Sequence, residues 1–288
     1  TLRVQDRTLH QVVVGGAFTG SLWRANLESR ELSGYVEYQE AKPPELPDGR
    51  VFARLSRLNV PASADSEAEQ LLEQPQSAQA LPALDIVVDE LELQGRKLGR
   101  LEVQASNQPG SSARREWRLD RFNMATPEAT LTARGRWALS RPGAPLVAAS
   151  AAERRHTELD FRLDIRDAGN LLQRFGMADV VRRGKGRIEG KVAWQGTPFG
   201  PDYASLAGQM QLGLESGQFL KAEPGLAKLL SVLSLQSLPR RLALDFRDVF
   251  SEGFAFDFVR GDVRIQQGIA QTNNLQMKGV NAAVLMEG

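Results

Sequence analysis

The stretch FAFDFVRGDVRIQQG, from Phe254 to Gly268, sets a pattern that most of the chain repeats. Apolar residues alternate with polar ones, and side chains in a β-strand point alternately to opposite faces. The alternation therefore predicts a hairpin with one apolar side, turning at Gly261 and Asp262. The apolar side would carry Phe254, Phe256, Phe258, Val263 and Ile265.

Composition excludes several classes of protein. The 288 residues are 42% hydrophobic and 25% charged, as in ordinary globular proteins, and the net charge of +1 lacks the basic excess that nucleic-acid binding requires. The chain has no cysteine, which excludes disulfides, a thiol nucleophile and a thiolate metal site. No apolar run approaches the roughly 20 residues of a membrane-spanning helix. Because both ends of the chain have the pattern of strands, we expect it to be part of a longer protein.

The chain divides into three parts by pattern. Residues 1–60 read as short strands, and residues 61–80 are polar and rich in Pro, Ser and Gln, which is typical of a linker or mobile loop. From 81 to 288 the alternation persists. We expect its apolar positions to form one wall: Ile86, Leu101, Val103, Leu119, Leu131, Phe161, Leu163, Val192, Leu212, Phe254, Phe256, Phe258, Ile265 and Met277.

Only two short helices are predicted, near 168–175 and 224–236. The second has leucines at helical spacing, at Leu226, Leu229, Leu230 and Leu233. It either docks on the sheet, or is mobile and contacts a membrane or gates the mouth of a trough. Two such helices cannot cover more than a dozen one-sided strands. A mainly β fold follows, either as two facing sheets or as one long curved antiparallel sheet that forms a trough.

Catalytic signatures are missing, so we expect neither an enzyme nor a bound cofactor or metal. The two histidines, His10 and His156, are far apart in the sequence, and neither a nucleophile elbow nor a P-loop occurs. GKGRIEG, residues 184–190, has the wrong spacing for a dinucleotide fingerprint and leads into a strand. With 35 acidic residues, a glycosidase with a catalytic pair of carboxylates remains an alternative. The four tryptophans, Trp23, Trp117, Trp137 and Trp194, either pack in the core or contact acyl chains and head groups.

Several segments together resemble one known family. FGMADVVRRGKGRIEGKVAWQG (175–196) is similar to a family segment of the form fG…v…G…l.g.l.W.G. The region that contains LDFRDV (244–249), FAFDFV (254–259) and GIAQTNNL (268–275) resembles the family's carboxy-terminal signature. The resemblance is to the carboxy-terminal part of YhdP proteins, within the AsmA-like group that also includes TamB. It covers 81–288 most clearly and is compatible with 1–60.

The resemblance implies a function. Family members are anchored in the inner membrane of Gram-negative bacteria, cross the periplasm and move phospholipids towards the outer membrane along a taco-like hydrophobic β-groove. It implies that the apolar positions given above line this groove, with phospholipids as partners and with the outer-membrane inner leaflet and envelope proteins as further partners. The alternative from the pattern alone is a closed β-sandwich with a structural or protein-interaction role in the cell envelope.

Overall fold

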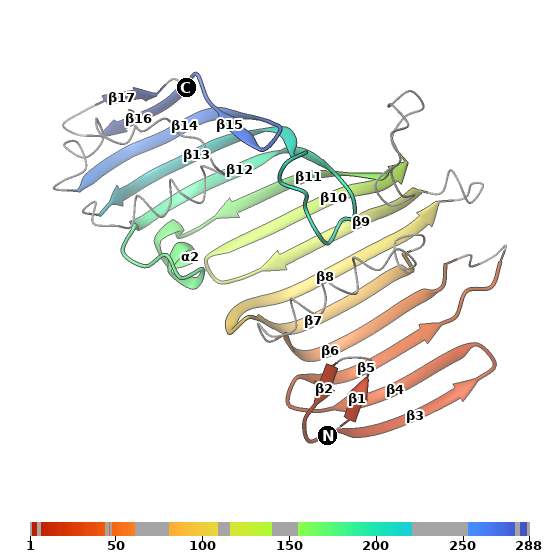
Figure 1. Cartoon of the computed structure of the whole chain (residues 1–288). Helices are drawn as coiled ribbons and strands as arrows, with labels where there is room; N and C mark the ends of the chain where they lie inside the picture. The colour runs from red at the N-terminus through yellow and green to blue at the C-terminus, as the bar shows by residue number, and fades with distance from the viewer. Residues whose placement is uncertain are drawn as a thin grey trace. The chain divides into compact units, whose positions relative to one another are not determined.

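The alternating segments form β-strands in the computed structural model (Figure 1). The structure describes residues 2–4, 7–43, 46, 48–60, 81–108, 116–139, 155–220, 253–279 and 283–286. The strands are β1 (Leu2–Val4), β2 (Arg7–Leu9), β3 (Val13–Thr19), β4 (Leu22–Glu28), β5 (Leu32–Gln39), β6 (Arg50–Val60), β7 (Ala83–Leu93), β8 (Arg96–Gln108), β9 (Glu116–Ala125), β10 (Ala129–Leu139), β11 (Arg155–Ile165), β12 (Val181–Gln195), β13 (Ala207–Phe219), β14 (Phe254–Gln266), β15 (Ile269–Gln271), β16 (Leu275–Gly279) and β17 (Ala283–Met286).

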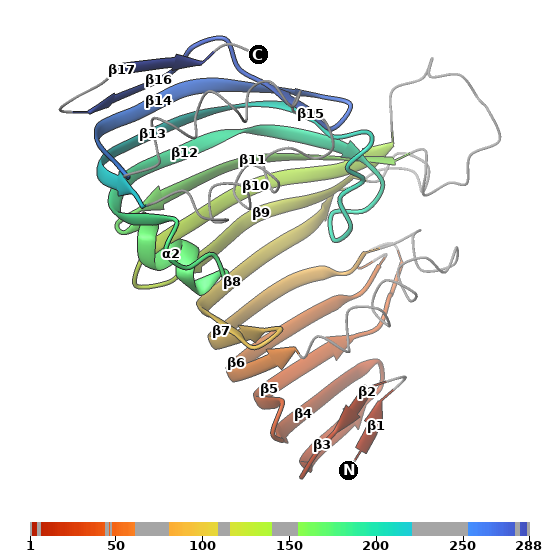
Figure 2. The ribbon, with the colours of Figure 1, turned by 60° about the vertical axis from the view of Figure 1, so that its left-hand side comes forward.

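Fifteen of these strands belong to one sheet, in an order that follows the chain from β3 to β14 and then through β16 to β17. β15 pairs with β14, and β1 and β2 form a separate pair. The sheet does not close on itself: β3 is the edge strand at one end of the pairing order and β17 is the edge strand at the other. Figure 2 shows strands that bend along their length. The expectation of a mainly β fold built on one long open sheet is confirmed.

One pair departs from the expected antiparallel arrangement. β6 and β7 are parallel, with Ala53 opposite Ile86 and Leu55 opposite Val88. The other strand pairs with a described register are antiparallel. A parallel pair needs a crossover of about a dozen residues or more, which a tight hairpin turn cannot supply. Residues 61–80, the predicted linker, make this connection and lie outside the described residues.

The hairpin predicted within 254–268 is wrong. β14 runs unbroken from Phe254 to Gln266, with Gly261 opposite Leu212 and Asp262 opposite Gln211 in β13. The chain turns instead at Gln267 and Gly268, whose φ angles are 52° and 73°. A two-residue hairpin loop of this kind requires positive φ at both central residues, and Gly261 does not have it.

The described residues contain one helix, α2 (Ala168–Arg174), where the sequence predicts a helix near 168–175. Asp167 caps its N-terminus, and the Asp167 carboxylate accepts a 3.0 Å hydrogen bond from the Asn170 backbone N–H. The helix predicted at 224–236 lies outside the described residues, with its leucines.

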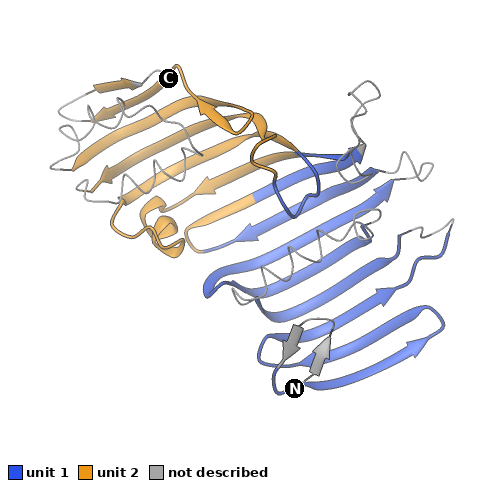
Figure 3. Cartoon of the chain, in the orientation of Figure 1, with its two compact units in different colours: residues 1–126, 132–158, 195–201 blue, residues 127–131, 159–194, 202–288 orange. Residues whose placement is uncertain are grey.

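Two compact units make up the chain (Figure 3). Unit 1 contains residues 1–126, 132–158 and 195–201, and unit 2 contains 127–131, 159–194 and 202–288. Unit 1 therefore includes strands that precede residues 61–80 in the sequence and strands that follow them. Each unit has two small clusters of buried apolar side chains, centred on Val88 and Trp137 in unit 1 and on Val180 and Phe256 in unit 2.

Candidate functional site

The sheet has one apolar face, which the cross-strand register defines in each unit. Residues directly opposite each other in neighbouring strands share a face. In unit 1 one such row consists of Gly16, Ala25, Val36, Ala53, Ile86, Val103 and Phe122. In unit 2 three rows consist of Val181, Phe219 and Phe254; of Ile188, Leu212 and Gly261; and of Val192, Gly208 and Ile265. We call the face that contains these rows the apolar face.

The opposite face is held by ion pairs between neighbouring strands. Arg54 Nη2 lies 2.8 Å from Asp85 Oδ1 in unit 1, and Arg187 Nε lies 2.8 Å from Asp164 Oδ1 in unit 2. Hydrogen bonds from Arg162 and Arg187 lower the pKa of Asp164, so its carboxylate stays charged. Exposed pairs of this kind stabilise little individually, but they suit a surface in contact with water. The sheet is therefore one-sided in both units.

Most of the predicted wall residues that the structure describes contribute to the apolar face. Ile86 and Leu101 pack in the Val88 cluster, Leu119 in the Trp137 cluster and Leu163 in the Val180 cluster. Phe254, Phe256, Met277 and Leu212 form or contact the Phe256 cluster. Ile265 is buried, and Val103, Leu131, Phe161 and Val192 are half-buried. Their role in contacting lipid stays a prediction.

Phe258 is the exception. The register of β14 with β16 shifts between Phe256 and Phe258, so the next side chain to join the Phe256 cluster is Val259. The Phe258 ring instead lies 4.5 Å from the guanidinium carbon of Arg260, an exposed side chain two residues along. A bulge inserts one residue and reverses the alternation beyond it. The prediction that Phe258 shares a face with Phe254 and Phe256 is wrong for this reason.

Large apolar side chains stand half in water where the apolar face crosses β3, β4 and β5. Phe18 is 52% exposed, Trp23 51%, Val14 48% and Tyr38 42%. Phe18 lies opposite Trp23, and Trp23 opposite Tyr38. We call these four residues the open aromatic patch. Val14, Phe18 and Tyr38 are not among the predicted wall residues, although the alternation of Val14, Gly16 and Phe18 indicates a shared face.

The structure separates the four tryptophans. Trp117, Trp137 and Trp194 are buried, which supports core packing, whereas Trp23 belongs to the open aromatic patch. The Trp23 indole Nε1–H donates a 3.1 Å hydrogen bond to Glu40 Oε1. The N–H group of the indole therefore has its hydrogen-bond partner, and the apolar part of the ring remains accessible to an apolar ligand.

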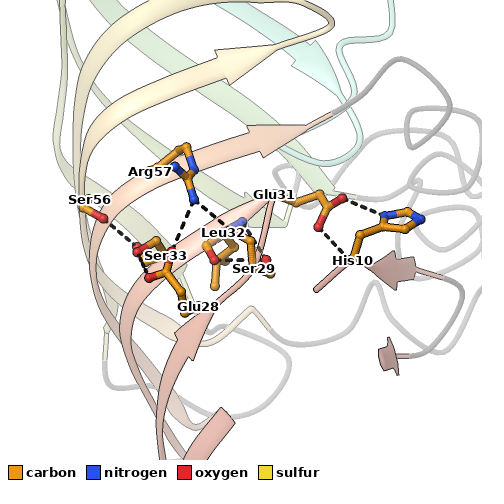
Figure 4. Close-up of polar contacts among 8 residues, drawn as sticks. All are labelled: His10, Glu28, Ser29, Glu31, Leu32, Ser33, Ser56 and Arg57. Atoms are coloured by element: carbon orange, nitrogen blue, oxygen red, sulfur yellow. Dashed lines mark hydrogen bonds and ion pairs between the residues drawn. The ribbon is translucent and has the colours of Figure 1, made fainter. Parts of the chain in front are cut away.

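The two histidines make separate contacts with glutamates. The backbone N–H and ring Nδ1 of His10 lie 2.9 and 2.8 Å from the two carboxylate oxygens of Glu31 (Figure 4). His156 Nε2 lies 2.9 Å from Glu158 Oε1. Within the described residues no group of three or more His, Cys, Asp or Glu side chains could hold a metal ion.

These features define a class of protein: a chain built on a one-sided, open β-sheet, without a layer of helices over its apolar face among the described residues. The family model described as "YhdP protein" matches residues 1–288, and the chain belongs to this family.

A relative is the "Intermembrane phospholipid transporter YhdP" of Escherichia coli (strain K12). It is 31% identical over 159 residues, which are 55% of this chain and 12% of that protein. The matched part is thus about an eighth of the relative's length. No solved structure matches the chain. No helix among the described residues is long and apolar enough to cross a membrane.

Proposed function

We propose that the apolar face binds phospholipid acyl chains and that this chain is a segment of a non-enzymatic bridge carrying phospholipids between the inner and outer membranes. The supporting observation is the open aromatic patch, in which four large side chains remain about half exposed on the apolar side of the sheet. Contiguous exposed apolar surface of this kind marks a ligand or interaction site. The name of the E. coli relative supports phospholipid as the ligand.

The rows of the apolar face fit a passive mechanism. They contain aliphatic, aromatic and glycine residues and no charged side chain, so an acyl chain meets no polar group along them. Burial against such a surface stabilises a bound acyl chain by about 0.8 kcal/mol per CH₂ group. This hydrophobic free energy depends on the apolar area that is buried and not on the orientation of particular groups. A lipid can therefore move along the apolar face without a fixed binding site.

The location follows from the same proposal. A bridge between two membranes lies in the periplasm, as part of a longer protein with an inner-membrane anchor and with contacts to the outer membrane or to envelope proteins. The closed β-sandwich is the competing arrangement. It requires a second sheet over the apolar face, and the only other sheet among the described residues is the two-stranded β1–β2 pair.

Two double variants of β3 test the proposal. Val14 and Phe18 point to the apolar face, opposite Leu27 and Trp23, whereas Val13 and Ala17 point to the other face, opposite Glu28 and Arg24. All four residues are exposed, so aspartate can replace them without entering a packed core.

We expect Val14→Asp/Phe18→Asp to lose bound phospholipid, because an acyl chain would have to desolvate a carboxylate. Val13→Asp/Ala17→Asp, in the same strand with the same added charge, should keep it. The measurement is mass spectrometry of lipids extracted from detergent-free protein, with circular dichroism to confirm folding. Equal lipid content in the two folded variants would reject an acyl-chain site at the open aromatic patch.

A further inference from the structure

The connection from β12 to β13 begins with a segment, residues 196–201, that belongs to unit 1 (Figure 3). We call it the strap. Its sequence is GTPFGP, with glycine at positions 196 and 200 and proline at 198 and 201. The prolines limit its conformations, and the glycines leave two points at which the backbone can rotate.

The base of the strap is tied to β11. The Gly196 N–H donates a 2.8 Å hydrogen bond to the Arg155 carbonyl, and the Gly196 carbonyl accepts a 3.0 Å hydrogen bond from Thr157 Oγ1. Gly196 has a φ of +102°, and an added Cβ would meet no atom within 4 Å. The site has room for a side chain, but the backbone conformation favours glycine.

The tip of the strap lies on the apolar face. The ring of Phe199 stands edge-on to Trp117, with 6.2 Å between the ring centroids and an interplanar angle of 63°. Trp117 is a buried member of the Trp137 cluster, next to Leu119. The Trp117 Nε1–H donates a 3.0 Å hydrogen bond to the Pro82 carbonyl, which fixes the indole ring in its place on the apolar face.

The two rings differ in how firmly they are held. Trp117 is 4% exposed, whereas Phe199 is 52% exposed. Phe199 thus leaves about half of its surface in water while it covers part of the wall. An acyl chain could replace it at Trp117 without displacing a hydrogen bond, because the contact is between apolar groups.

We propose that the strap is a movable cover and that Phe199 occupies the position over Trp117 which a phospholipid acyl chain takes when the strap lifts. The inference rests on the proposed function and adds to it a particular position, at Trp117, which the chain itself fills in the absence of lipid. Gly196 is the hinge, and Phe199 competes with lipid for the wall.

Three single variants of the 288-residue chain test this. Phe199→Ala removes the ring that competes with lipid, and Gly196→Ala keeps the ring but disfavours the backbone conformation that holds the strap in place. Tyr203→Ala is the matched control, because Tyr203 is an aromatic residue of the same connection, is 57% exposed and has no described ring contact. Phe199 is exposed, and a Cβ added at Gly196 meets no atom within 4 Å, so both variants are expected to fold.

The measurement is the rate at which each protein takes up a phospholipid with a fluorescent acyl chain from vesicles of phosphatidylethanolamine and phosphatidylglycerol. We expect Phe199→Ala and Gly196→Ala to take up lipid several-fold faster than the unaltered chain, and Tyr203→Ala to match it. Hydrogen–deuterium exchange gives a second readout: lipid should increase exchange in residues 196–201 of the unaltered chain.

The outcomes separate the two proposals. Equal uptake by the unaltered chain, Phe199→Ala and Gly196→Ala would reject the strap as a cover and leave the lipid-binding function standing. Slower uptake by Phe199→Ala would also reject it, because the ring would then be part of the binding wall. Absence of uptake by every protein, although all are folded, would reject the lipid-binding function and the cover together.

Discussion

The ring of Phe18 in β3 lies 4.3 Å from the ring of Trp23 in β4, and about half of each side chain is in water. The two residues face each other directly in the antiparallel register. Aromatic pairs of this kind contribute to sheet stability, but their exposed ring faces remain free for an apolar ligand. The pair therefore offers a direct way to detect a lipid on the apolar face.

Trp23 should report lipid binding by fluorescence. A phospholipid with a spin label on its acyl chain should quench part of the tryptophan emission, because Trp23 alone among the four tryptophans is half exposed. Trp23→Phe should abolish that part. Trp194→Phe, which removes a buried tryptophan, should leave it. Quenching that is undiminished in Trp23→Phe would show that no acyl chain contacts the open aromatic patch, whereas a remainder is expected from an acyl chain at Trp117.

Gly217 in β13 should be intolerant of a side chain. An added Cβ would come within 2.4 Å of the Phe256 ring, which lies over Gly217 on the apolar face. Gly217→Ala should lower the free energy of unfolding by about 1–3 kcal/mol, the usual cost of overpacking. In the same strand, Gly213→Ala meets no atom within 4 Å and should have little effect. Denaturant unfolding of both variants checks this, and equal stabilities would contradict the tight contact.

The ion pair between Arg174 of α2 and Glu128 should hold the helix in place. Their side chains are only 24% and 13% exposed, and Arg174 donates two hydrogen bonds to the carboxylate of Glu128. We expect Arg174→Met to cost about 1.5–3 kcal/mol, as for hydrogen bonds to charged groups.

The matched control is the more exposed pair of Arg162 and Asp164, at 46% and 40%. Arg162→Met should lower stability clearly less than Arg174→Met, because water screens an exposed pair. Thermal unfolding of both variants compares them. A larger loss in Arg162→Met would show that burial does not determine the strength of these pairs.

The contact of Glu31 with His10 should give stability that depends on pH. Partial burial raises the pKa of Glu31, but hydrogen bonds from the His10 backbone N–H and ring outweigh it and hold the pKa below its ordinary value of 4.5 (Figure 4). A lowered pKa in the folded state means that the stabilisation is present above pH 4.5 and is lost as the pH falls through the lowered value.

Glu31→Gln removes this titration. The variant should be less stable than the unaltered chain at neutral pH, and the difference should shrink as the pH falls below 4.5. Thermal unfolding at a series of pH values measures it. A difference that stays constant down to pH 3 would show that the Glu31 charge contributes nothing.

The alternation of apolar and polar residues predicts a mainly β chain and most positions of the apolar face, but not the course of β14 at Gly261 or the face of Phe258. It correctly placed Leu163 of β11 and Val192 of β12 on the apolar face, because side chains alternate strictly in an unbroken strand. The short helix at 168–174 was also predictable, since Asp167 and the spacing of Leu171 and Leu172 are local signals.

Only the tertiary structure decided where the alternation slips and which apolar residues stay uncovered. The bulge at Phe258 and the parallel pairing of β6 with β7 depend on the neighbouring strand, which local pattern does not specify. The same holds for Trp23, which the sequence does not distinguish from Trp117 or Trp137. A residue's exposure is set by what lies over it, and for Trp117 that includes Phe199, 82 residues further along the chain.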